Sequence, residues 1–372
     1  MGVSLQSKIK YILDIGSSSI CLIATTKFAG KPRIIAEENI LYDGFIDGEF
    51  LCEDLEEVLS VALQGMKDKI RKPINSVIVG VPSDFSVCVC KRISRKFVHQ
   101  HKVTERDVAN MYETNFVFAD SEKYQIVNYS PMQFVLDDDV KTMTPVGKKT
   151  TSLVLDASYI LAKKSFISIM QQAFKNIGIK NVEFISSALG QAMTCEPVTD
   201  NGKPIVIVDV GHINTSVCVY KGEGLALLSS FSMGGGHISA DLMQLLGLNF
   251  KDAELIKRKI ILTVESSKNE NYEACYKGNL IKAPINITNQ IVKSRIETIA
   301  KVIKDILSIN ESFKDIDLYL TGDGISNFKG VKNILKDIIG LDVYEYKIPF
   351  NTSNDKFKTS KMGLVSLANI LV

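Results

Sequence analysis

A short motif occurs twice in this chain, and it constrains the fold more than any other feature of the sequence. The segment ILDIGSSS ends an apolar run at Asp14, and the segment IVDVGHIN ends a second apolar run at Asp209. In each copy the Asp is followed by one apolar residue, a glycine and a few small or polar residues before the next β-branched run. An internal repeat of this kind indicates two related structural units. If the two units face each other, both turns meet at one cleft.

The residues around the two copies predict the same start of a sheet. In the first copy, three β-branched runs, a segment of helical period and one more apolar run predict three strands, a helix and a fourth strand; they cover residues 8–15, 19–27, 33–41, 53–70 and 74–81. The second copy repeats the three-strand start at 205–209, 215–220 and 225–232. This order looks like one half of a ribonuclease-H-like sheet. We therefore expect an α/β, duplicated two-domain fold.

Residues 82–150 interrupt this pattern and predict an inserted subdomain. Strands are expected over 84–93 and 124–136, with a helix between them that Thr104 opens and Asp107 caps. A strand over 153–162 and a helix over 164–177 are expected to return the chain to the first domain. A turn-rich stretch at 197–204 is the candidate hinge. The predicted domains are residues 1–81 with 151–197, the insertion 82–150, and 204–372 with a smaller helical subdomain around 234–315.

Composition narrows the classes of function. The chain has 44 Lys and Arg residues against 42 Asp and Glu residues, a net charge of +2, so no overall basic field favours nucleic acid as a partner. No apolar run reaches the roughly 18 residues of a membrane helix, and the first residues lack the apolar stretch of a signal peptide. The seven cysteines are an odd number set mostly in apolar segments, typical of thiols in a reducing compartment. These features predict a cytoplasmic protein.

The two repeated turns have the chemistry of phosphate loops. Glycine lets backbone N–H groups approach phosphate oxygens, and the Ser and Thr hydroxyls add donors. An Asp at each turn, Asp14 and Asp209, suits Mg²⁺ held through water, because this ion keeps several of its waters and takes few protein ligands. Either turn alone is also compatible with an ordinary hairpin. Their pairing at equivalent positions favours the phosphate-loop hypothesis.

Two further glycine-rich turns fit the same hypothesis. The segment SMGGG at 232–236 leads into a helix predicted over 238–246, and a glycine-rich entry to a helix N-terminus favours anions. The segment LYLTGDG at 318–324 ends an apolar strand, and its glycines would let the backbone lie against a nucleoside. Each turn also has an ordinary interpretation, as a flexible turn and as a strand-to-helix connection.

The order of these motifs resembles that of the actin, sugar-kinase and heat-shock-chaperone ATPase superfamily. Within it the sequence is most similar to the FtsA family of bacterial cell-division actin homologues. The supporting features are the segments NSVIVGV at 75–81 and YSPMQFVL at 129–136, the segment AELIK at 253–257 and the insertion at 82–150. The resemblance covers nearly the whole chain. It implies an actin-like fold with an FtsA-type inserted subdomain.

The resemblance also implies ATP and Mg²⁺ as cofactors and assigns residues to them. Carried over position by position, the cofactor-binding residues are Asp14, Gly16, Ser17 and Ser18 at the terminal phosphates, Gly211, Asn214 and Thr215 in the second loop, Gly234, Gly235 and Gly236 near phosphate and sugar, Glu254 and Lys257 at the nucleoside, and Gly322, Asp323 and Gly324 behind the adenine. Asp14 and Asp209 hold Mg²⁺ through water, and Asp209 is the candidate catalytic residue. For Glu254 and Lys257 the alternative is a solvated ion pair.

The sequence departs from the family pattern at two places. The second loop commonly reads Asp-x-Gly-Gly-Gly-Thr-Thr-Asp, whereas here His212 and Ile213 replace two glycines and Ser216 replaces the acidic residue. Loss of that acid removes a water-orienting group, so the sequence predicts nucleotide binding with at most slow ATP hydrolysis. The chain also stops at SKMGLVSLANILV, which looks like the last helix of the actin core, without the membrane-binding tail usual in the family.

The resemblance implies a division scaffold that polymerises and tethers FtsZ to the membrane and the division machinery. Its expected partners are the FtsZ C-terminal peptide, further copies of itself, other division proteins, and the membrane through a tail absent from this sequence. The expected location is the cytoplasmic face of the inner membrane at the division site. Two alternatives stay open. A small-molecule kinase would need a general base beyond the two loop acids, and a PilM-like pilus-assembly protein would share the insertion.

Two smaller features predict no further site. Cys88 and Cys90 lie on one face of a predicted strand, but no second Cys or His pair at ligand spacing completes a zinc site. A basic stretch follows them in the insertion, formed by Lys91, Arg92, Arg95, Lys96 and Lys102. It fits either contact with an acidic partner or anionic lipid, or a solvated strand end.

Overall fold

The computed structural model describes residues 9–28, 31–51, 53–113, 118, 120–198, 202–264, 270–313 and 316–347. The helix predicted at 360–372 lies outside these residues. Among the described residues, no helix is both long enough and apolar enough to cross a membrane.

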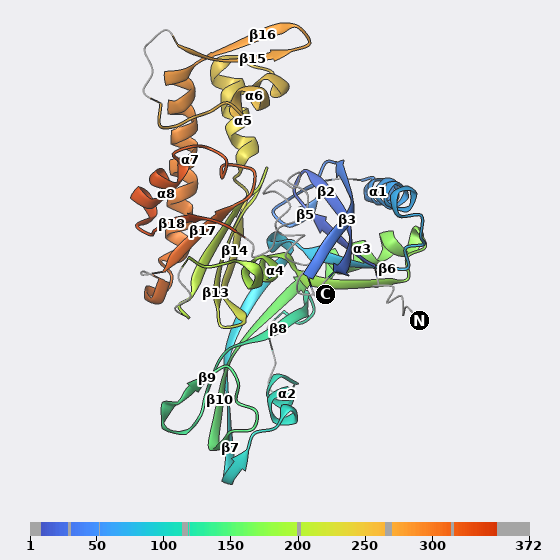
Figure 1. Ribbon diagram of the computed structural model, residues 1–372, viewed down its shortest axis with the longest axis vertical. Helices are drawn as coiled ribbons and strands as arrows, with labels where there is room; N and C mark the ends of the chain where they lie inside the picture. The colour runs from blue at the N-terminus through green and yellow to red at the C-terminus, as the bar shows by residue number, and fades with distance from the viewer. Residues whose placement is uncertain are drawn as a thin grey trace.

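The first sheet has five strands in the order β11-β6-β1-β2-β3. They are β1 (Lys10–Ile15), β2 (Ser19–Phe28), β3 (Lys31–Leu41), β6 (Ser76–Val81) and β11 (Asn181–Ser186). The first three strands run antiparallel to one another, and β6 and β11 run parallel to β1. Helices α1 (Leu55–Ile70) and α3 (Lys164–Asn176) share one apolar core with this sheet (Figure 1). A short hairpin, β4 (Phe45–Ile46) with β5 (Glu49–Phe50), precedes α1.

The second copy of the motif builds a sheet of the same topology, in the order β14-β13-β12-β17-β18. Its strands are β12 (Ile205–Val210), β13 (Thr215–Lys221), β14 (Gly224–Phe231), β17 (Asp317–Thr321) and β18 (Val343–Glu345). Asp14 and Asp209 are the penultimate residues of the central strands β1 and β12. The predicted duplication and the actin-like class of fold are therefore confirmed.

Four helices and a hairpin complete the second half of the molecule. They are α5 (Gly235–Leu246), α6 (Phe250–Lys257), α7 (Ile285–Leu307), α8 (Val331–Ile339), and the strands β15 (Asn271–Tyr276) and β16 (Asn279–Pro284). A short helical turn, η3 (Glu311–Phe313), follows α7. Residues of all these helices and of the hairpin join the core of the second sheet. In Figure 1 the hairpin lies at one end of the longest axis of the molecule.

The insertion forms a separate four-stranded sheet at the opposite end of that axis (Figure 1). Its order is β7-β10-β8-β9, with β7 (Ser86–Lys102), β8 (Tyr124–Val135), β9 (Lys141–Thr142) and β10 (Lys149–Lys163). Helix α2 (Glu105–Glu113) packs beside it, and two short turns are η1 (Ser83–Phe85) and η2 (Asp137–Asp139). The expected cap of α2 is confirmed, because Thr104 N–H donates to Asp107 at 2.9 Å and Asp107 N–H donates to Thr104 Oγ1 at 3.2 Å.

One strand was assigned to the wrong sheet. The strand predicted over 153–162 was expected in the first domain, whereas in the structure β10 pairs with β7 and β8 along its length. Strand β7 is also longer than predicted, because it continues through the basic stretch to Lys102. A β-branched run predicts a strand but not its partner, which is set by contacts distant in sequence. The inserted sheet therefore reaches Lys163, where α3 begins.

The inserted sheet contacts the edge of the second sheet. Ser158 Oγ of β10 donates to Leu225 O at 2.7 Å, and Leu225 N–H donates back to Ser158 Oγ at 3.1 Å. The helix α4 (Ser187–Thr194), which follows β11, packs in an apolar cluster between the two halves. Both halves are thus held together by α4 and by the inserted sheet.

Candidate functional site

A polar cavity of about 250 Å³ lies between the two five-stranded sheets. Its walls are the turn after β1, the turn after β12, the turn after β17, the segment after β6 and the N-terminal part of α4. In each half, the turns that follow parallel strands meet at the same edge of a sheet, so all five segments reach one place. Ligands of open α/β sheets bind at such an edge.

Nine of the predicted site residues line this cavity. They are Asp14, Gly16, Ser17, Ser18, Asp209, Gly211, Asn214, Gly322 and Asp323. Thr215, Gly234, Gly235, Gly236, Glu254, Lys257 and Gly324 do not line it. The structure thus brings together most of the two Asp turns and part of the turn after β17, whereas the glycine turn before α5 and the pair Glu254 and Lys257 lie outside the cavity wall.

The two repeated carboxylates line the cavity, and both residues are half-buried. Burial is the main cause that raises the pKa of Asp14 to about 6, and the charge of Asp209 adds to it. Burial likewise raises the pKa of Asp209, with a contribution from Asp323. Because the charge of Asp209 acts on Asp14, the pair of carboxylates favours a proton or a cation between them.

Helix α4 positions both carboxylates from its N-terminal half. Gln191 Nε2 donates to Asp209 Oδ2 at 2.5 Å, and Ser187 Oγ donates to Asp14 Oδ1 at 3.4 Å. The two side chains are four residues apart and therefore share one face of the helix. Ser186 begins the helix, because its Oγ accepts the Leu189 N–H at 3.2 Å. One short helix thus contacts a carboxylate of each sheet.

Three residues of the cavity wall, Ser187, Gln191 and Asp84, are absent from the residues predicted from the sequence. The spacing of Ser187 and Gln191 behind an N-cap serine is a usable signal, but it says nothing of what the helix faces. Asp84 lines the cavity from η1, directly after β6. Its signal is its place just past the carboxyl end of a strand parallel to β1, the edge where ligands bind. A third acid beside Asp14 and Asp209 was therefore predictable in type and place.

Glycines pack the turns of the second half against one another. Gly235 N–H donates to Gly211 O at 2.9 Å, and Gly324 N–H donates to Val210 O at 2.8 Å. A Cβ added at Gly235 would lie 2.6 Å from Gly324 Cα. Gly322 has a φ of +85°, a region that L side chains rarely adopt. These glycines have a packing role in the protein, and their approach to a nucleotide stays a prediction.

Side chains of three helices hold the glycine turn before α5. Lys257 is 7% exposed, and its Nζ donates to Gly235 O at 3.0 Å, Ser239 Oγ at 2.9 Å and Glu254 Oε1 at 2.5 Å. Three partners use all three protons of the ammonium group. The pair of Lys257 with Glu254 is thus not the solvated ion pair of the alternative interpretation.

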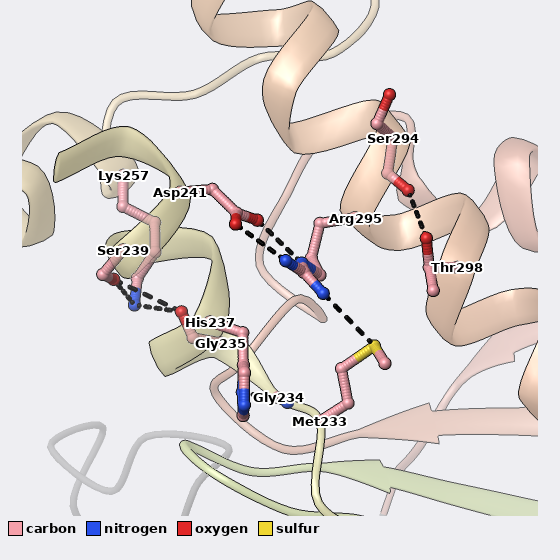
Figure 2. Close-up of polar contacts among 10 residues, drawn as sticks. All are labelled: Met233, Gly234, Gly235, His237, Ser239, Asp241, Lys257, Ser294, Arg295 and Thr298. Carbon is pink, nitrogen blue, oxygen red and sulfur yellow. Dashed lines mark hydrogen bonds and ion pairs between the residues drawn. The ribbon is translucent and has the colours of Figure 1, made fainter. Parts of the chain in front are cut away.

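On the other side of the turn, Arg295 of α7 contacts α5. Its Nε and one terminal nitrogen each donate to the carboxylate of Asp241 at 2.7 Å, and the other terminal nitrogen lies 3.8 Å from Met233 Sδ. Such a two-point pair fixes orientation as well as distance. Figure 2 shows both groups of contacts around the turn.

The residues of the cavity fit a hydrated cation accompanied by phosphate. Among the described residues that line it, four are aspartates and none is Lys or Arg, so phosphate alone meets only negative side chains. The described residues contain no group of three or more His, Cys, Asp or Glu side chains placed to ligate one ion. Asp14 and Asp209 would hold Mg²⁺ through its waters, and the ion would neutralise phosphate charge.

His212, which stands where the family has glycine, is half-buried and lines the same cavity. A Cβ added at Gly236 would lie 2.8 Å from His212 Nε2, so the imidazole covers that glycine. Burial and the Lys257 charge lower the pKa of His212. The imidazole therefore contacts both the cavity and the glycine turn before α5.

In sequence, the chain is similar to FtsA proteins. The family model described as "Cell division protein FtsA" matches residues 206–361. Cell division protein FtsA of Enterococcus faecalis is 23% identical over 345 residues, which cover 90% of this chain and 77% of the relative.

Solved structures resemble the chain in fold. MreB5 of Spiroplasma citri bound to ADP has a TM-score of 0.57 at 12% identity, covering 97% of this chain and 95% of that one. The PilM-PilN type IV pilus biogenesis complex gives a TM-score of 0.57 at 13% identity, covering 97% of both chains. The MamK double helical filament gives 0.50 at 12% identity, covering 97% and 98%. The chain therefore has an actin-like fold, and its sequence is similar to that of the FtsA family of cell-division proteins.

Proposed function

We propose that this chain is an ATP-binding division scaffold that assembles into filaments and tethers FtsZ to the membrane and the division machinery. In this proposal ATP and Mg²⁺ occupy the cavity between the two sheets. The protein itself acts at the cytoplasmic face of the inner membrane. ATP turnover is at most slow, because Ser216 stands where the family has an acid.

The observation that carries the proposal is the meeting of both Asp-x-Gly turns in one cavity. Either turn by itself is an ordinary feature of a sheet. Together they present Asp14 and Asp209 from opposite sides, with Ser17 and Ser18 as hydroxyl donors. A cation between two domains and a ligand that bridges them favour the closed arrangement. The similarity to the FtsA family and the filament reported for MamK support the assembly part of the proposal.

The test combines three measurements on the full chain. Calorimetry with ATP and Mg²⁺ measures binding, electron microscopy on a lipid monolayer detects filaments, and fluorescence anisotropy with the FtsZ C-terminal peptide measures tethering. We expect the chain to bind ATP with Mg²⁺ and to bind the FtsZ peptide, and we expect filaments only when nucleotide is present. Lack of both filaments and FtsZ-peptide binding under every nucleotide condition would remove the scaffold proposal.

Asp84 favours one competing function, a small-molecule kinase of the same superfamily. Such an enzyme needs a general base beside its acceptor hydroxyl, and Asp84 is a third carboxylate in the cavity besides the two loop acids. Its amide partner Asn214, however, already occupies one carboxylate oxygen. Phosphorylation of an added polyol or sugar at the expense of ATP would favour this second candidate.

A further inference from the structure

Among the hydrogen bonds that cross from the first half of the molecule to the second, three join turns of the two halves. Asn214 Nδ2 donates to Asp84 Oδ1 at 2.5 Å, Ile213 N–H donates to Ser17 Oγ at 3.1 Å, and Ser232 Oγ donates to Asp47 Oδ1 at 2.5 Å. Of these three, only the first joins two side chains that both line the cavity.

The contact of Asp84 with Asn214 is the least satisfied of the three. Asn214 is only 8% exposed, and its Oδ1 accepts no hydrogen bond from the residues that the structure describes. Burial raises the pKa of Asp84, and the Asp47 charge adds to it, while the Asn214 amide and Lys163 oppose the shift. A buried acceptor without a partner costs about 1–3 kcal/mol. This contact is therefore easier to exchange than one in which both side chains are fully satisfied.

Asn214 stands where the family's second loop has threonine, between Gly211 and Thr215 of the proposed phosphate loop. Its amide group is a donor that points at Asp84 in the present arrangement. A phosphate oxygen needs such a donor, and the amide has two N–H groups, of which one is given to Asp84. A phosphate group bound to the same amide would lie beside the Asp84 carboxylate, and the two negative charges repel each other. Asp84 and a phosphate group therefore compete as partners of Asn214.

We propose that Asn214 senses phosphate in the cavity: its amide donates to Asp84 when the phosphate position is empty and to a phosphate oxygen when it is filled. The proposal rests on the proposed ATP binding and adds a competition within it. The bond between Asp84 and Asn214 then lowers the affinity of the cavity for ATP.

The place of Asp84 in the chain gives this exchange a consequence. Asp84 lies in η1, and β7 of the inserted sheet begins two residues later at Ser86. Ser86 Oγ donates to Pro82 O at 3.0 Å, which ties the start of β7 to the same turn. When Asn214 no longer contacts Asp84, we expect the first residues of β7 to be held less firmly. Binding of phosphate in the cavity would then increase amide exchange at the start of β7.

The experiment measures ATP affinity by calorimetry in the presence of Mg²⁺ for the full chain and four variants. Asp84→Ala removes the competing acceptor and should raise ATP affinity about ten-fold, as expected for a hydrogen bond to a charged group. Asn214→Ala should not bind more tightly than the native chain. The double variant Asp84→Ala/Asn214→Ala should lose the gain. Asp47→Ala is the matched control, because it removes a carboxylate and a cross-cleft contact outside the cavity wall.

The outcomes separate competition from simple charge removal. A gain that persists in the double variant would show that Asp84 acts only through its charge and would overturn the sensor. Unchanged affinity in Asp84→Ala, or an equal gain in Asp47→Ala, would also overturn it. Absence of ATP binding in the native chain and in every variant would instead refute the proposed ATP site, and the sensor with it.

Hydrogen exchange provides a second readout that does not depend on affinity. With saturating ATP and Mg²⁺, the amides of residues 86–89 should exchange faster than in the ligand-free native chain. In Asp84→Ala they should already exchange at the faster rate, with no further change on adding ATP. Equal protection with and without ATP in the native chain would contradict release of the β7 root.

Discussion

Folding changes the acid chemistry of Asp14, which lines the cavity. In the folded protein the residue is half-buried, and its pKa rises from 3.8 to about 6. A carboxyl with a raised pKa stabilises the folded state below its unfolded pKa, and this contribution is lost as pH rises through the folded value. Each pKa unit corresponds to 1.36 kcal/mol.

We therefore expect the free energy of unfolding without Mg²⁺ to fall by roughly 3 kcal/mol between about pH 4 and pH 6 on account of Asp14. Asp14→Asn should flatten this part of the profile and stabilise the ligand-free protein at pH 7. Urea denaturation at several pH values measures the effect. A native profile that rises over this window would contradict the raised pKa of Asp14.

Asp209 provides the matching test with metal. Its predicted role is to hold Mg²⁺ through water, so Asp209→Ala should weaken ATP binding chiefly when Mg²⁺ is present. Asp317→Ala, a carboxylate at the other end of the neighbouring strand β17, is the control. Calorimetry with Mg²⁺ and with EDTA makes the comparison. An equal loss of affinity in both conditions would contradict the metal role.

At the scale of elements, the glycine turns decide whether the second half packs. A side chain at Gly235 meets the backbone of Gly324, and one at Gly322 meets Val210 O in a left-handed backbone conformation. Overpacking costs about 1–3 kcal/mol, and a left-handed conformation adds roughly 1–2 kcal/mol.

Gly322→Val should therefore lower the free energy of unfolding by about 2–5 kcal/mol even without nucleotide. Gly340→Val, at a left-handed glycine with open space around it, separates backbone strain from overpacking and should cost less. Urea denaturation of both variants without ligand gives the comparison. Loss of ATP binding by Gly322→Val at unchanged stability would show instead that the glycine serves the nucleotide.

At the scale of the whole molecule, the inserted sheet is the expected assembly surface. It projects from one end of the longest axis (Figure 1), and at its far end Val98 is 92% exposed. A filament needs a contact that repeats without closing, and an exposed apolar residue there favours such a contact. β10 extends from this far end to α3, so removing the whole insertion would also expose strands that the core needs.

A single surface change is therefore the sharper test of assembly. Val98→Asp should shorten or abolish filaments on a lipid monolayer while ATP affinity stays within two-fold of native, because Val98 lies far from the cavity. Ile309→Asp, which changes another exposed apolar residue, at 76%, should leave filaments intact. Normal filaments from Val98→Asp would remove this end of the inserted sheet from the interface.

Local sequence patterns were enough to predict one group of features. The repeated Asp turns, the three-strand starts, the cap at Thr104 and Asp107 and the presence of an insertion all follow from residue types at short spacing. Each Asp turn follows the central strand of its own sheet, so the duplication places the two turns at equivalent edges. Because the two halves face each other in the folded protein, nine of the predicted site residues line a single cavity.

The contacts between segments distant in sequence became known only from the folded structure. It paired β10 with β7 and β8, placed α4 where Ser187 and Gln191 reach both carboxylates, and brought Asp84 to Asn214, 130 residues away in the chain. It also buried Lys257 against the glycine turn. These contacts join residues distant in sequence, and their free energies depend on burial and on competing partners, so no local pattern encodes them.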